Sequence, residues 1–114
     1  MSFEFEKRAA RHLLTMLEDG TRPIADIQVE AEQADPALVY LIFAWLRDRY
    51  HPGHSAAEGV LGRIVALCQA SPKVARMASE GEKDGICVWF EESYSYRELD
   101  REAFIDLVVE KLEG

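Results

Sequence analysis

The chain has 114 residues, of which 48% are hydrophobic and 30% charged, with a formal net charge of −8. This composition fits one globular domain over residues 1–114 and excludes a disordered or low-complexity chain. The longest apolar run, residues 37–46, has half the length that a membrane-spanning helix needs, and the N-terminus lacks the pattern of a secretory signal. We therefore expect a cytoplasmic protein that does not enter a membrane.

Three helices are predicted in the first fifty residues. Apolar residues recur at helical spacing over residues 5–18 and 24–34. Asp35 is placed to cap a third helix that has Pro36 in its first turn. Because residues 37–46 are all apolar, we expect this third helix to lie at the centre of the molecule, surrounded by the others.

Two further helices are predicted after the helix-breaking residues 51–53. Ser55 and Glu58 have the spacing of a capping box, and an apolar face follows them as far as Cys68. Ser71 and Pro72 repeat the pattern of a cap followed by a proline and predict a shorter helix over residues 72–78.

From residue 86 the apolar period changes to two, which is typical of strands. Residues 86–90 and 94–97 alternate in this way and predict a β-hairpin that turns at residues 91–93. Asp100 is placed to cap a final helix. We therefore expect an α+β fold that is predominantly α, with about five helices and a C-terminal hairpin packed by the final helix.

The negative charge is concentrated near the C-terminus. Residues 1–79 hold ten acids against nine bases, whereas residues 80–114 hold eleven against four. Aromatic side chains with polar tips stand among these acids, as in many recognition surfaces. We therefore predict a non-enzymatic protein-protein interaction module, of the adaptor or inhibitor type, whose partner has a basic surface. The predicted partner-binding residues are Trp89, Glu91, Glu92, Tyr94 and Tyr96.

The predicted hairpin would have two edges with unpaired backbone groups. Such edges accept a further strand, so we also expect a homodimer, or a partner that adds a strand there.

The alternative function is a helix-turn-helix-like DNA-binding regulator built on the N-terminal helices. A short helix over residues 24–34 precedes a helix that begins with a proline, which is the order found in small regulators. The second of these helices has almost no polar side to present to bases, and the chain is acidic, so nucleic acid is not the expected partner. One continuous surface formed by the following arginines would favour the alternative: Arg8, Arg11, Arg22, Arg47 and Arg49.

No catalytic, metal or cofactor site is predicted. His51, His54 and Glu58 are candidate metal ligands, but they flank a Pro-Gly pair and lack a fourth ligand nearby. Cys68 and Cys87 lie in apolar contexts without a neighbouring base, so we expect packed thiols rather than a disulfide or a nucleophile.

Overall fold

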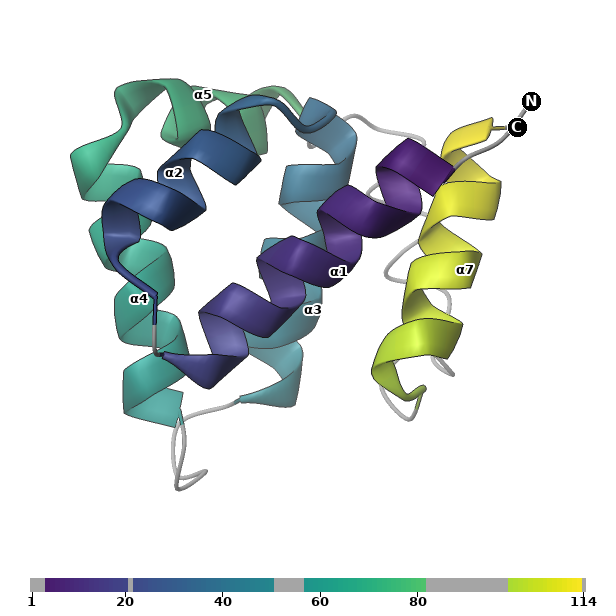
Figure 1. Ribbon diagram of the computed structural model, residues 1–114, viewed down its shortest axis with the longest axis horizontal. Helices are drawn as coiled ribbons and strands as arrows, with labels where there is room; N and C mark the ends of the chain where they lie inside the picture. Colours follow the sequence, from purple (N-terminus) through teal and green to yellow (C-terminus); the bar gives the residue numbers. More distant parts are fainter. Residues whose placement is uncertain (1–3, 21, 51–56, 82–98, 114) are drawn as a thin grey trace.

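Figure 1 shows the computed structural model of the chain, which describes residues 4–20, 22–50, 57–81 and 99–113. Every element in these ranges is a helix. The helices are α1 (Glu4–Asp19), α2 (Ile24–Glu32), α3 (Pro36–Arg49), α4 (Ala57–Ala70), α5 (Pro72–Glu80) and α7 (Arg101–Glu113). None of these helices is both long enough and apolar enough to cross a membrane.

The predicted α+β class is wrong, because the described part of the chain is all-helical and contains no strand or sheet. Residues 86–97, which were assigned to the hairpin, lie outside the described residues. In the described part of the chain, the final helix α7 packs against both α1 and α3. Phe104 of α7 stacks on Trp45 of α3, with ring centroids 4.3 Å apart, so a helix covers this face of the central helix.

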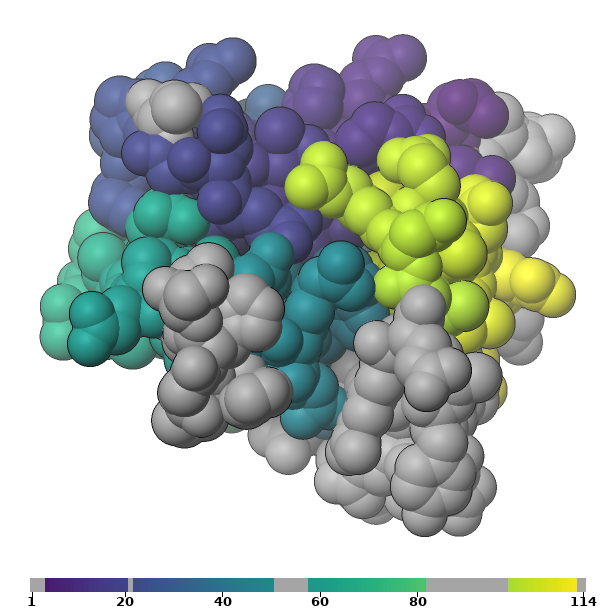
Figure 2. Space-filling view, turned by 90° about the horizontal axis from the view of Figure 1, so that it is seen from below, coloured from purple at the N-terminus to yellow at the C-terminus, as the bar shows by residue number. Residues whose placement is uncertain are grey.

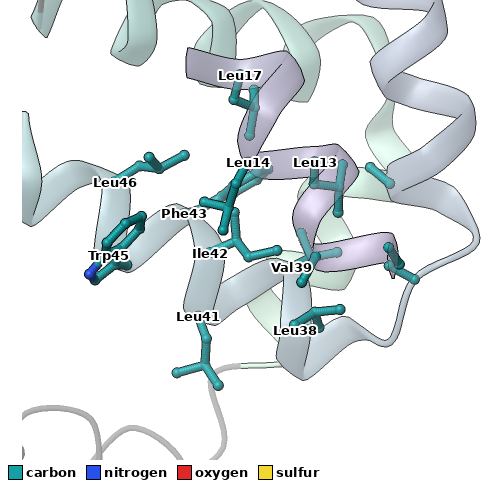
Figure 3. Close-up of a cluster of buried hydrophobic side chains, with 14 of the residues drawn as sticks. Leu13, Leu14, Leu17, Leu38, Val39, Leu41, Ile42, Phe43, Trp45 and Leu46 are labelled. Atoms are coloured by element: carbon teal, nitrogen blue, oxygen red, sulfur yellow. The ribbon is translucent and has the colours of Figure 1, made fainter. Parts of the chain in front are cut away.

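The central position of α3 is confirmed. Residues 38–43 are all buried, as are Trp45 and Leu46. The helix begins as predicted, since the Asp35 side chain accepts a hydrogen bond of 2.8 Å from the backbone N–H of Ala37. Figure 3 shows leucines of α1 packed against one side of α3, while Trp45 points to another side. A helix that is apolar all round is stable in water only when its neighbours cover it in this way.

The end of α1 is held by a residue from α4. Gly20 ends the helix with a φ of +75°, a left-handed conformation that glycine adopts without strain. The Arg63 guanidinium then donates hydrogen bonds to the backbone carbonyls of Leu17 and Glu18, which have no partner within the helix. α1 and α4 are therefore joined by backbone capping as well as by apolar packing.

The two ends of α5 fit closely against other helices. Ser71 is buried, accepts from the backbone N–H of Val74 as the predicted cap and donates to Glu32 of α2 at 2.6 Å. At the other end, Gly81 lies so near the start of α3 that an added Cβ would stand 2.1 Å from the carbonyl oxygen of Pro36. Only glycine fits at this contact without a shift of the backbone.

Candidate functional site

All five predicted partner-binding residues (Trp89, Glu91, Glu92, Tyr94 and Tyr96) lie outside the described residues. The nearest described residues on either side of this segment are Gly81 and Leu99, and both contact α3. Gly81 contacts Pro36 at the first residue of α3, and the carbonyl of Leu99 accepts from Arg49 at the last. A helix of this length measures about 20 Å. Gly81 and Leu99 therefore lie at opposite ends of the central helix.

Part of the C-terminal negative charge is matched by cations of α1. Arg11 forms a two-pronged pair with Glu102 of α7 at 2.8 and 2.9 Å, and Lys7 lies 3.1 Å from Asp106. Figure 2 shows α7, in yellow-green, seated against α1, in purple. Arg11 is the main cause that lowers the pKa of the Glu102 carboxyl, through its hydrogen bond. These two acids hold the first and last helices together, so they contribute less to the attraction of a basic partner than the sequence count implies.

Glu18 is a largely enclosed carboxylate of α1 that joins three helices. Its side chain is 12% exposed and accepts two hydrogen bonds from Arg101 of α7, at 2.8 and 3.2 Å. It also accepts from the Tyr50 hydroxyl, and Arg49 lies 4.0 Å away. Burial and then the bond to Glu18 raise the pKa of Tyr50. A carboxylate with its lone pairs engaged in this way acts as a joint between helices rather than as a general base.

The described residues contain no group of three or more potential ligands that could hold a metal ion. His51 and His54 lie outside the described residues, and Glu58 is exposed in the first turn of α4. Cys68 is half-buried, and this burial raises the pKa of its thiol, which opposes nucleophilic reactivity. The Ser71 hydroxyl donates to the Glu32 carboxylate, but Ser71 is buried and its oxygen also caps α5, so this pair is closed to a substrate.

The geometry gives the DNA-binding alternative little support. A recognition helix must place polar side chains in the major groove, whereas residues 38–43, 45 and 46 of α3 are buried and only its last turn is exposed. The five arginines fall into two groups. The first group lines hollows between α1 and α2 and consists of Arg8, Arg11 and Arg22; Arg47 and Arg49 lie at the end of α3.

Two neighbouring hollows lie between α1 and α2, with volumes of about 190 and 380 Å³, and they share His12 and Glu30. These two side chains lie 3.7 Å apart across the groove. Arginines alternate there with acids, since Asp19 and Glu30 line the same groove. Because its charges are mixed, this groove has no marked preference for a ligand of either sign.

A more apolar hollow of about 410 Å³ lies along α4 and reaches Arg47 of α3. It is lined by Arg47, Leu61, Ile64, Val65, Cys68 and Gln69. The sequence predicted one broad apolar face on this helix, but the structure divides it. Val60, Ile64 and Leu67 are buried, whereas Val65 is 54% exposed. The sequence contained one sign of this division: the apolar face of α4 is wider than the stripe that one side of a helix normally buries.

Comparison of the chain with models of protein families, with curated proteins and with solved structures finds no match in any of the three.

Proposed function

We propose that this chain is a non-enzymatic protein-interaction module, of the adaptor or inhibitor type, which meets a basic partner through the acidic and aromatic residues of its C-terminal third. The observation that carries the proposal is the attachment of Gly81 and Leu99 to opposite ends of α3. The chain between them holds five acids against two bases and four aromatic residues. Gly81 and Leu99 both contact α3, the most buried helix of the described structure.

The ion pairs of the structure reduce the number of C-terminal acids on which the proposal relies. Glu102 and Asp106 are paired with Arg11 and Lys7 of α1, so the proposal assigns the contact with a basic partner to the acids of residues 82–98. Aromatic residues in such a setting are frequent anchors of binding energy, and acids around them mainly set the association rate and the choice of partner.

The test is an affinity purification with the full chain as bait, followed by mass spectrometry at low and high salt. Trp89→Ala is expected to weaken capture of a specific partner more than about tenfold. Glu91→Lys is expected to weaken capture most at low salt, where charge attraction is least screened. Asp26→Lys is the matched control, because it makes the same change of charge at an exposed position on α2.

Capture that is lost with Trp89→Ala and Glu91→Lys but kept with Asp26→Lys supports the proposal. A set of captured proteins that is the same for all three variants contradicts it.

A further inference from the structure

The exposed face of α4 carries no charge over most of its length. Glu58, Gly62, Val65 and Gln69 recur at intervals of four, three and four residues and are all exposed, so they form one strip along the helix. The only other charged residue in α4 is Arg63, which turns inward to cap α1. Solvent-facing helix surfaces are normally rich in charge, and a face without it is typical of a contact with another helix.

Along this strip, the exposed side chain of Val65 lies next to Gly62, which has no side chain. Val65 is 54% exposed, which makes it one of the three large apolar side chains that the described surface exposes. Gly62, nearly one turn earlier, has no atom within 4 Å of the place where a Cβ would lie. A second helix can therefore approach closely at Gly62, while Val65 reaches toward that helix.

We propose that this face of α4 packs antiparallel against the same face of a second copy of the chain. A twofold axis that passes between Gly62 and Val65 would place the valine of each copy over the glycine of the other. The same axis would bring Glu58, at the start of α4, to the end of the partner's helix that carries Gln69. Arg47 of α3 lines the apolar hollow together with Cys68 and Gln69, which belong to that end, and its charge acts on Cys68.

Charge complementarity selects this arrangement. In the antiparallel pair, Glu58 of each copy meets Arg47 of the other, so the dimer contains two Glu58–Arg47 ion pairs. A parallel pair would set Glu58 beside Glu58, which is unfavourable. The half-buried Leu61 and Cys68, which line the hollow beside the strip, would lose their remaining contact with water.

The size of the face sets the expected strength of the dimer. A helix of 14 residues is about 21 Å long, and one helix face buries less than the roughly 800 Å² per partner of a standard interface. The dimer is therefore weak and depends on protein concentration. In Figure 1, α4 and α7 lie on opposite sides of the molecule, so this contact leaves α7 uncovered.

The experiment is sedimentation velocity of the full chain over a concentration series that reaches the millimolar range. The wild-type chain is expected to pass from monomer to dimer, and Val65→Glu to raise the dissociation constant of the dimer more than about tenfold. Val29→Glu is the matched control, because Val29 is 56% exposed on α2 and should leave the dimer unchanged. Circular dichroism of each variant establishes that it is folded.

A charge exchange tests the orientation of the two helices. Glu58→Arg alone and Arg47→Glu alone should each weaken the dimer, and the double variant should restore it, because the pair is then matched with reversed signs. A chain that stays monomeric at every concentration would overturn the proposal. So would a dimer that survives Val65→Glu, or a double variant that is weaker than both single ones.

Discussion

Replacement of Gly81 by alanine should destabilise the protein through a single backbone contact. The added Cβ would stand 2.1 Å from the carbonyl oxygen of Pro36, 2.6 Å from its carbonyl carbon and 2.9 Å from the Cα of Ala37. All three atoms belong to the backbone, so no change of rotamer relieves the overlap. The start of α3 must therefore move away from the end of α5, and the buried side chains between these helices must shift with it.

The magnitude follows from two opposing effects. Forcing extra volume into a packed site costs about 1–3 kcal/mol, and the upper end applies here because a backbone must move. Gly81 has a φ of −72°, which alanine adopts readily, so the reduced freedom of the unfolded chain returns about 0.4–1 kcal/mol. We therefore expect Gly81→Ala to lower the free energy of unfolding by about 2 kcal/mol, which corresponds to a fall in Tm of about 8 °C.

Urea denaturation followed by circular dichroism measures this change, with an expected shift of the midpoint of about 1 M. Gly62→Ala is the control, because nothing lies within 4 Å of its added Cβ and its position is inside a helix. It should raise the free energy of unfolding by about 1 kcal/mol. If Gly81→Ala proves neutral or stabilising, the close approach of α5 to α3 is not present in solution.

Two further predictions concern polar contacts. Ser71→Ala removes the cap of α5 and the bond to Glu32, so the free energy of unfolding should fall by about 1–2 kcal/mol in urea denaturation; an unchanged midpoint would argue against the cap. The pKa of Glu102 is lowered by Arg11, so this carboxylate stabilises the fold at neutral pH, and the contribution is lost as the pH falls below its ordinary value of 4.5. Glu102→Gln should therefore be less stable than the wild type at pH 7, and the difference in thermal unfolding should close at acidic pH; a difference that stays constant down to pH 2 would contradict this assignment.

The helices were predictable where caps and apolar spacing agreed. Asp35, Ser71 and Asp100 each accept a backbone N–H as predicted, because a short polar side chain before a helix has few other favourable roles. The burial of α3 was also predictable, since residues 37–46 offer no polar side to water.

The fold class was not predictable from the same rules. The alternation over residues 86–90 is short, and a period of two over five residues specifies neither a partner strand nor the element that covers it. Which helix would cover Trp45 depended on a long-range contact with Phe104, and nothing local in the sequence signals that contact. In the described residues, this aromatic stack places α7 against the Trp45 side of α3.

The candidate surfaces were predictable only in part. The width of the apolar face of α4 was visible in the sequence, but its division into a buried half and an exposed half depends on how α2 and α5 pack. The count of C-terminal acids was correct, whereas the pairing of Glu102 and Asp106 with α1 required the three-dimensional arrangement. Charge totals along a sequence do not show which charges the protein matches internally.

The pair formed by Arg11 and Glu102 joins positions 91 residues apart. Such a separation makes this one of the slower contacts to form, because a long loop must close before the pair contributes any stability. On a ribosome, α1 would leave the exit tunnel well before α7 has been made, and its basic flank would meet water or chaperones in the meantime. The last step of folding would then be the arrival of α7, which covers Trp45 and pairs Lys7 and Arg11 of α1 with acids in one event.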